Sequence, residues 1–398
     1  MSETLYQYYR QQSVLPTYGG FRSDEDLAAH ERHRRRLFTD KLFLPPRLFK
    51  NSRLLEFGPD AGENSLVFAR WGAHCILAEP NQKAHPVIRD YFRRFQLEDR
   101  LASLEASDVA SFPDPKSESE RFDLIDAEGF IYTVKPESIW MGKFARLVRD
   151  EGMVVLFYCE AYGSLVELML KVVQSRFRQL TGLDALQAAH RLFDAKWNSI
   201  PHKRKIESWV MDVLENPFVR LRYFFEPVSL CRQMGQAGFR LYSSWPSYHD
   251  GLDVHWFKKI RDEDEQWPLL EEFIARSRLS HVFGRTHFLT QRDRDLEKTL
   301  SNLLKLTDGL VDDFDDDDAK RAGALWARLA QKLESHRILT DGPDRAASLR
   351  TVNCFQRLLS LLRQGSPHKL VQFCTRNRAF IQSWGMPSHF AVFRKTGL

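Results

Sequence analysis

Cysteine is scarce in this sequence, and its few copies form no recognisable pattern. The 398 residues include five cysteines, and no two of them are spaced as Cys-x-x-Cys. Such pairs mark zinc sites and dithiol redox sites, so we expect neither. An odd number of scattered thiols suits a reducing compartment better than a disulfide framework. We therefore expect free, buried or half-buried thiols and no bound metal at Cys75, Cys159, Cys231, Cys354 and Cys374.

Long uncharged apolar runs are also missing. The most apolar stretch, Gly152 to Val173, is interrupted by Glu160, Glu167 and Lys171. A membrane-spanning helix needs about twenty predominantly apolar residues, so this stretch cannot cross a bilayer. The first residues contain no apolar core of the kind that signal peptides have. We therefore expect a cytoplasmic protein with no membrane span.

The sequence also lacks a large excess of positive or negative charge. The net charge is +5, and basic clusters alternate with acidic ones, which gives little support for nucleic-acid binding. Hydrophobic residues make up 43% and charged residues 28%, a globular composition. The chain is longer than a single core requires, so two domains, or one domain with a large appendage, are expected.

From Arg53 onward, short apolar runs alternate with helical stretches. Five strands are predicted at residues 53–57, 74–78, 101–105, 122–127 and 153–158. Five strand-helix steps in about a hundred residues predict a doubly wound α/β sheet of the Rossmann-like kind. A closing pair of strands is expected at Phe239 to Ser243 and Val254 to Lys258, beyond a helical insertion at residues 161–226.

Beyond about Arg261 the pattern predicts helices and no strand, hence an all-α C-terminal domain. The acidic run from Asp312 to Asp318 is expected to be a solvated loop. The predicted domains are an N-terminal leader and basic helix at residues 1–48, a domain at 49–260 that contains the insertion, and a helical domain at 261–398.

The loop from Leu55 to Asn64 lies where the first strand turns into a helix. Its sequence is Leu-Glu-Phe-Gly-Pro-Asp-Ala-Gly-Glu-Asn. Glycine lets the chain bend sharply and lets its backbone approach a ligand closely. In a doubly wound sheet, ligands bind beyond the carboxyl ends of the strands, which is where this loop lies.

This loop resembles the first motif of class I S-adenosylmethionine-dependent methyltransferases, acidic-x-Gly-x-Gly-x-Gly. The matching residues are Glu56, Gly58, Asp60 and Gly62, with aspartate in place of the middle glycine. The resemblance covers residues 53–259 and is most like methyltransferases of bacterial surface-polysaccharide or small-molecule pathways. It implies an S-adenosyl-L-methionine cofactor, with Asp60 near the amino group of its methionine part.

Further cofactor ligands follow the next strands. Glu79 ends the second strand, 21 positions after Gly58, and a carboxylate there can accept hydrogen bonds from both ribose hydroxyls. In the resembling family that position is the ribose ligand, and Asp108 matches the adenine contact. The family also places residues close to the methyl group after the fourth strand, where Asp126 lies.

A dinucleotide-dependent oxidoreductase would share the ribose carboxylate. The loop lacks the Gly-x-Gly-x-x-Gly fingerprint, and both Glu56 and Asp60 would repel a pyrophosphate. Coulomb's law favours a cationic sulfonium cofactor at the same place. The methyltransferase interpretation is therefore preferred, and the NAD(P)-dependent oxidoreductase remains as an alternative.

Methyl transfer to a hydroxyl needs alignment of the nucleophile and removal of its proton. Glu128, after the fourth strand, is the first candidate for the base, with Tyr132 nearby. His249, in the turn Ser247 to Gly251, is the second candidate because histidine titrates near neutrality. His190 and His202 in the insertion are weaker candidates for the acceptor pocket.

The N-terminal region offers two further features. His30 to Arg36 form a basic helix segment, which we expect to be mainly a solvated face, although it could attract an anionic acceptor. The preceding leader could fold over the cofactor as a lid, with Tyr18 and Phe21 in contact.

Together these features predict O-methylation of a sugar-like or other small hydroxyl acceptor. The fourth strand ends in Asp-Ala-Glu-Gly and not in an Asn-Pro-Pro-Tyr-type motif, so a protein or nucleic-acid acceptor is disfavoured. The insertion would build the acceptor pocket, and the C-terminal helices would mediate homo-oligomer assembly or partner binding. The alternative from another class is a non-catalytic scaffold with the same fold.

Overall fold

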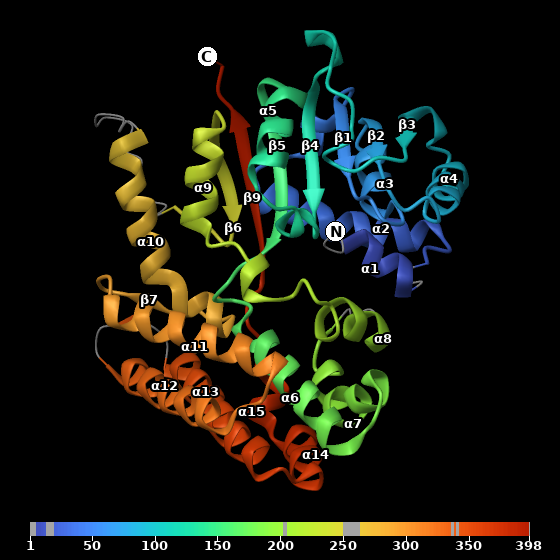
Figure 1. Cartoon of the computed structure of the whole chain (residues 1–398). Helices are drawn as coiled ribbons and strands as arrows, with labels where there is room; N and C mark the ends of the chain where they lie inside the picture. The colour runs from blue at the N-terminus through green and yellow to red at the C-terminus, as the bar shows by residue number, and fades with distance from the viewer. Residues whose placement is uncertain are drawn as a thin grey trace. The chain divides into compact units, whose positions relative to one another are not determined.

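The computed structural model describes residues 5–12, 20–201, 205–249, 263–335, 338–339 and 342–397. The chain forms two compact units, and each is built from separated segments of sequence (Figure 1). The first unit comprises residues 1–158, 227–248 and 389–398, and the second comprises 159–226 and 249–388. The domains predicted from the sequence follow chain order, whereas these two units interleave.

A seven-stranded sheet forms the centre of the first unit. Its strands are β1 (Arg53–Phe57), β2 (His74–Ala78), β3 (Leu101–Glu105), β4 (Phe122–Glu128), β5 (Val148–Cys159), β6 (Phe239–Trp245) and β9 (Ser388–Lys395). They are arranged in the order β3-β2-β1-β4-β5-β9-β6. The first five strands pair in parallel, and β9 is antiparallel to β6. The predicted doubly wound sheet is thus confirmed.

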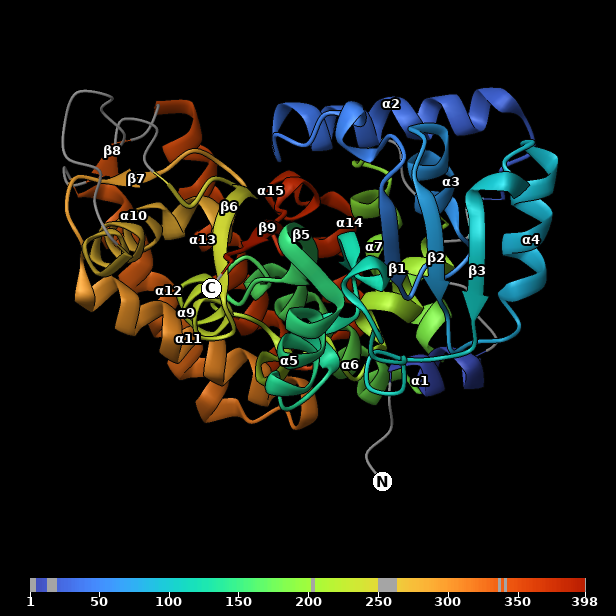
Figure 2. The ribbon, with the colours of Figure 1, turned by 90° about the horizontal axis from the view of Figure 1, so that it is seen from above.

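Helices cover both faces of this sheet. They are α2 (Asp24–Asp40), α3 (Glu63–Arg70), α4 (His85–Arg94), α5 (Ser138–Leu147) and α9 (Pro227–Gln236), and α1 (Leu5–Gln12) precedes them. Figure 2 shows α2 and α3 on one face and α5 and α9 on the other. Strand residues alternate between faces, so Leu54 and Leu124 join the core under α2 and α3, while Phe57 stacks on Phe144 of α5.

The prediction that no strand follows residue 261 is wrong. Ser388–Lys395 forms β9, which lies between β5 and β6 in the sheet. Its five consecutive buried residues are covered on both faces, so the sequence lacks the alternation that marks a half-buried strand. β9 is the partner of β6, from Phe239↔Lys395 to Trp245↔Phe390. The partner predicted from the sequence, Val254 to Lys258, lies outside the described residues.

The second unit is helical. Its helices are α6 (Leu165–Thr181), α7 (Ala185–Trp197), α8 (Ile206–Trp209), α10 (Glu263–Phe283), α11 (Arg294–Asp312), α12 (Asp316–Glu334), α13 (Gly342–Gln364), α14 (Pro367–Arg376) and α15 (Arg378–Gln382). Two-residue strands β7 (Phe288–Leu289) and β8 (Ile338–Leu339) pair with each other. A helical C-terminal region was predicted and is confirmed.

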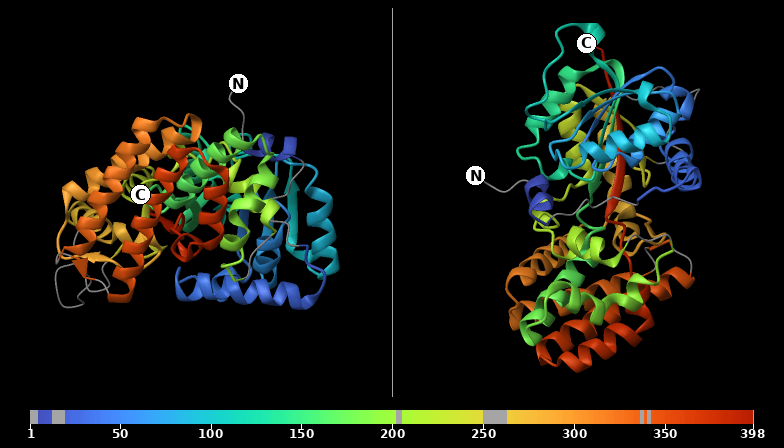
Figure 3. Two further views of the ribbon diagram at one scale, coloured as in Figure 1. Left: turned by 90° about the horizontal axis from the view of Figure 1, so that it is seen from below. Right: turned by 90° about the vertical axis from the view of Figure 1, so that its right-hand side faces the viewer.

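Helices of the insertion and of the C-terminal region share one apolar core. Met169 of α6, Phe193 of α7, Trp326 of α12 and Phe355 of α13 all belong to it. Both views of Figure 3 show the green helices α6 and α7 beside the red helices α13 and α14. A half-buried ion pair adds a polar link, because Arg220 donates to Asp308 at 2.8 Å. The insertion at residues 161–226 is therefore part of the helical unit.

All five cysteines are free, as predicted, and four of them are buried. The acidic run is not simply a loop: Asp312 ends α11, and Asp315 caps α12 by accepting hydrogen bonds from the backbone of Asp317 and Asp318. Among the described residues, no helix combines the length and apolar composition needed to cross a membrane.

Candidate cofactor site and active site

The loop between β1 and α3 holds three residues in the left-handed region of backbone space. Their φ angles are +64° at Gly58, +52° at Asp60 and +83° at Gly62, which is the N-cap of α3. Aspartate adopts this conformation more readily than most residues with a side chain, so it fits the position where the motif has glycine. A Cβ atom at Gly58 would lie 3.0 Å from the ring of Phe130, so this position needs glycine for space as well.

Glu79 connects this loop to the end of β2. Its carboxylate accepts hydrogen bonds from the backbone N–H of Asp60 at 3.0 Å and of Asn81 at 2.7 Å. Burial is the main reason why the pKa of Glu79 is raised to about 8, and the nearby carboxylate of Asp60 adds to it. The two elements that the sequence motif singled out, 21 residues apart, therefore meet at one place.

Three carboxylates lie next to each other at the carboxyl ends of β1 and β4. Glu56 is the register partner of Asp126, and Glu128 follows two residues later on the same face. Ser65 Oγ donates to Glu56 at 2.5 Å. Burial raises the pKa of Glu56 to about 7, and burial together with the charges of Glu128 and Glu56 raises the pKa of Asp126 well above its ordinary value.

Arg34 of α2 supplies the positive charge for this group. Its two terminal nitrogens donate to the two oxygens of Glu128 at 2.9 and 2.6 Å, in the bidentate geometry that arginine favours. The Arg34 side chain is almost fully buried, and its guanidinium lies 4.6 Å from the ring centre of Phe38 and 5.4 Å from that of Phe68. We call Arg34, Glu56, Asp126 and Glu128 the buried charge cluster.

Two more polar side chains extend the contact between α2 and the cofactor loop. Asn64 Nδ2 donates to Glu128 at 3.3 Å, and the Asn64 oxygen lies 3.0 Å from His30 Nε2. The expectation that residues 30–36 form mainly a solvated face is therefore wrong for Arg34 and His30, while Arg35 and Arg36 are exposed. Arg34 shares a helix face with the buried Leu27 and Phe38, and that position was the overlooked signal.

The other predicted residues lie in more varied surroundings. Asp108 is exposed, and its carboxylate accepts hydrogen bonds from the backbone and side chain of Ser111 at 2.8 and 2.7 Å. Tyr132 is buried after β4. Phe21 stacks on Tyr91 with ring centres 5.8 Å apart, so this part of the leader packs on α4. Tyr18 lies outside the described residues, so the predicted lid is described only at Phe21.

Two of the histidine candidates are exposed side chains of the second unit. His249 lies in the bend after β6. His190 is exposed on α7 and contacts Asp194 at 2.9 Å. His202 lies outside the described residues.

Sequence reasoning missed a buried chain of hydrogen bonds in the first unit. Tyr158 at the end of β5 is hydrogen-bonded to Tyr248, whose hydroxyl lies 2.7 Å from His389 Nδ1. All three side chains are fully buried. His389 belongs to β9, a strand that was not predicted, so nothing in the sequence pattern connected this histidine to the sheet. A histidine joined to two phenols can accept and pass on protons.

Comparison with known proteins identifies the family. A family model described as methyltransferase domain matches residues 28–244, more than half of the chain. This match includes the loop after β1, Glu79 and the buried charge cluster. No curated protein matches the chain.

Solved structures give distant matches. The YcgJ protein from Bacillus subtilis is 15% identical with a TM-score of 0.28, and the match covers 49% of this chain and 65% of that one. Magnesium protoporphyrin IX methyltransferase from Synechocystis PCC 6803, solved with bound SAM, is 11% identical with a TM-score of 0.29, covering 38% and 70%. A putative sarcosine dimethylglycine methyltransferase from Galdieria sulphuraria is 9% identical with a TM-score of 0.34, covering 94% and 85%.

These similarities carry no conclusion about the acceptor. In the first three matched structures the aligned part spans 65%, 42% and 49% of their length, which is less than two thirds in each. The family assignment rests on the family model and on the sheet order. The chain belongs to the methyltransferase-domain family, a family of S-adenosylmethionine-dependent enzymes with this Rossmann-like sheet.

Proposed function

We propose that this protein transfers the methyl group of S-adenosylmethionine to a hydroxyl group of a small, sugar-like acceptor. The observation that carries the proposal is the left-handed loop from Gly58 to Gly62, hydrogen-bonded to the buried carboxylate of Glu79. Glycine at both ends lets the backbone approach the cofactor, and Glu79 would accept hydrogen bonds from its ribose.

Each cofactor contact is assigned to one group. Asp60 would pair with the amino group of the methionine part, and Asp108 would contact adenine. Glu56 and Asp126 would provide negative potential near the sulfonium. The buried charge cluster contains three carboxylates and one guanidinium, and the pKa values of Glu56 and Asp126 are raised, so a nearby sulfonium would favour their charged forms, whereas a pyrophosphate would be repelled by any of them that is charged. This supports methyl transfer over the dinucleotide alternative.

Removal of the acceptor proton needs a base. Glu128 and His249 remain our candidates. The bidentate contact with Arg34 restricts how Glu128 could act. Both oxygens of Glu128 already accept hydrogen bonds from the guanidinium of Arg34. Glu128 would therefore reach an acceptor hydroxyl as base only after Arg34 moves. Kinetics of Glu128→Gln and His249→Asn as a function of pH would separate the two roles, because only the variant that lacks the base loses the acidic limb of the kcat profile, the rise of kcat as the base becomes deprotonated.

Calorimetric titration with S-adenosylmethionine tests the cofactor site. Glu79→Gln keeps the size of the side chain but removes its charge, and we expect the affinity to fall about tenfold or more, as loss of a charge-assisted hydrogen bond implies. Glu105→Gln, an exposed acid at the end of neighbouring β3, is the matched control and should bind like the wild type. No binding to the wild type would favour the non-catalytic scaffold.

The acceptor can be identified by following the transfer of a labelled methyl group from S-adenosylmethionine. Incubation with methyl-labelled S-adenosylmethionine and pools of sugars, glycosides and other hydroxyl compounds should label one class. Labelling of amines, proteins or nucleic acids in place of hydroxyl compounds would refute the acceptor part and leave the cofactor part intact. Light scattering of the full chain tests the proposed assembly through the C-terminal helices.

A further inference from the structure

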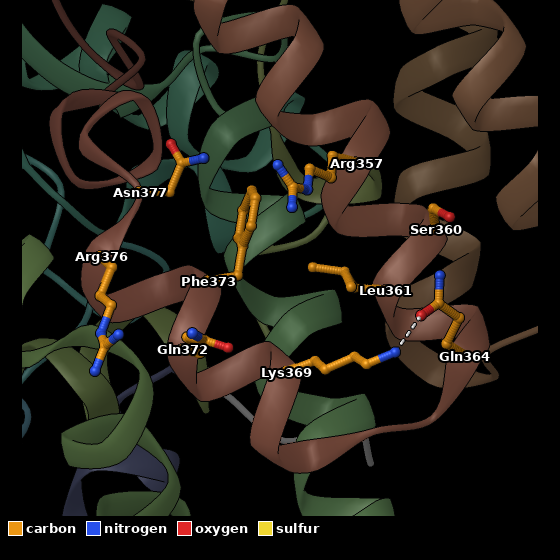
Figure 4. Close-up of a pocket in the computed structure, with 9 residues that line it drawn as sticks. All are labelled: Arg357, Ser360, Leu361, Gln364, Lys369, Gln372, Phe373, Arg376 and Asn377. Carbon is orange, nitrogen blue, oxygen red and sulfur yellow. Dashed lines mark hydrogen bonds between the residues drawn. The ribbon is translucent and has the colours of Figure 1, made fainter.

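A pocket of about 660 Å³ lies between α13 and α14 of the helical unit. Its walls are two helix faces, which Figure 4 shows opposite each other. The lining residues are Arg357, Ser360, Leu361 and Gln364 of α13 and Lys369, Gln372, Phe373, Arg376 and Asn377 at α14. We call this pocket the α13–α14 groove.

The two faces have the same helical spacing. Arg357, Leu361 and Gln364 are separated by four and three residues, as are Lys369, Phe373 and Arg376. Residues at this spacing share one side of a helix. Gly365, with a φ of +64°, allows the sharp turn between the helices. The groove is thus formed by the local sequence of one helical hairpin.

Positive charge in the groove is not balanced by neighbouring acids. Arg357, Lys369 and Arg376 are exposed, and within the described ranges none of them forms an ion pair with a carboxylate. Arg357 lies over the ring of Phe373 at 5.7 Å, and Lys369 Nζ donates a hydrogen bond to the amide oxygen of Gln364 at 3.4 Å. None of the nine lining residues is acidic. An anion would find donors here and no competing negative charge.

The sequence around the groove has the same bias. In the second unit, residues 345–388 contain seven lysines and arginines and neither aspartate nor glutamate, whereas the whole chain has 58 basic and 53 acidic residues. Charge elsewhere in the second unit is mixed: on α12, for example, Lys320 and Arg321 pair with Asp317 and Asp318. Arg363 of α13 also has an acidic partner, Asp316, whereas the three cations that line the groove have no carboxylate partner within the described ranges.

We propose that the α13–α14 groove binds a small molecule that carries two or more phosphate groups. Three separated cations suit several negative charges, and arginine matches phosphate in a bidentate way. The side-chain amides of Gln364 and Gln372 and the hydroxyl of Ser360 can complete the hydrogen bonding. The volume falls in the range of small-molecule sites and exceeds that of a single phosphate. The groove is formed by residues of the helical unit alone, and the proposal does not depend on the proposed methyl transfer.

Calorimetric titration of the full-length protein with inorganic pyrophosphate and with uridine diphosphate tests the proposal. Both should bind, and uridine without phosphate should not. In the triple variant R357Q/K369Q/R376Q we expect affinity for both probes to fall about tenfold or more, because charge-assisted hydrogen bonds are lost. The affinity of the wild type should also decrease as salt is raised.

A matched control variant distinguishes binding at a specific site from a general effect of the protein's net charge. R294Q/K298Q/K305Q removes the same three charges from exposed positions of α11 and should bind the probes like the wild type. Equal loss in both triple variants would refute the site, as would tight binding of uridine. Binding of a nucleic-acid duplex with no binding of either small probe would also refute it. S-adenosylmethionine titrations of the same variants report on the cofactor site independently.

Discussion

At the scale of single residues, the site is defined by carboxylates that the fold buries before any cofactor is present. Near neutral pH, Glu79, with a pKa of about 8, is mostly protonated and Glu56, with a pKa of about 7, is partly protonated, because burial disfavours their charged forms. A sulfonium beside them would favour ionisation and lower both pKa values. Binding of S-adenosylmethionine should therefore release protons.

The first prediction concerns this proton release. Titrations at pH 7 in buffers with different ionisation enthalpies should show protons released on binding S-adenosylmethionine. The demethylated product has an uncharged sulfur and should release fewer. In Glu79→Gln the release should be smaller than in the wild type. Equal proton release with donor and product would contradict the prediction that Glu79 and Glu56 respond to the charge of the sulfonium.

The same pKa values predict how stability changes with pH. The pKa of Glu79 is raised in the folded protein from 4.5 to about 8. Its contribution to stability is complete below 4.5 and is lost as pH rises through 8, by at most about 1.4 kcal/mol per pH unit. Urea unfolding from pH 5 to 8 should show a weaker decline in Glu79→Gln than in the wild type. Glu105→Gln should follow the wild type, and parallel curves for all three would contradict the prediction.

Arg34 allows a sharper test of the buried charge cluster. Arg34→Ala leaves the Glu128 carboxylate partly buried without its guanidinium, so we expect the free energy of unfolding to fall by about 3–5 kcal/mol. Lysine lacks the bidentate geometry, so Arg34→Lys should recover only part of that loss. Arg35→Ala, on the exposed face of the same helix, should cost about 1 kcal/mol or less. Equal losses of unfolding free energy at both positions would show that the buried pair Arg34–Glu128 stabilises the protein no more than an exposed ion pair does.

At the scale of elements, the first five strands could be predicted because each is short, apolar and followed by a helix. The cofactor loop could be predicted for a similar reason: glycine at Gly58 and Gly62 and an acid 21 residues after Gly58 mark one known arrangement. The position of Arg34 could not be read from charge patterns, because its partner Glu128 is 94 residues away. Contacts over such separations arise from packing and leave no local periodicity.

β9 was missed for a related reason. A strand covered on both faces has no alternating pattern, and its partner β6 lies about 150 residues earlier in the chain. The strand should nonetheless be important for stability. Val392→Ala removes two buried methyl groups, and we expect a loss of about 2 kcal/mol in the free energy of unfolding. Arg394→Ala, whose partner Glu151 is exposed, should cost about 1 kcal/mol or less and is the control.

At the scale of the whole molecule, the chain leaves the sheet after β5, returns for α9 and β6, and returns again for β9. Each unit therefore depends on segments that are distant in sequence. The core of the helical unit joins the insertion to the C-terminal helices, so an apolar face of α6 or α7 has its partners beyond residue 263.

This interleaving predicts that the chain cannot be cut at residue 260, where the sequence pattern places a domain boundary. A fragment of residues 1–260 would lack β9, leaving the backbone of β6 unpaired, and would expose the apolar faces of α6 and α7 that α11 to α14 cover in the full chain. We expect this fragment to aggregate and to bind no S-adenosylmethionine, whereas the full chain binds it. Solubility, thermal unfolding and calorimetry compare the two directly. A soluble fragment that unfolds cooperatively and binds the cofactor as the full chain does would show that residues 49–260 form an independent domain.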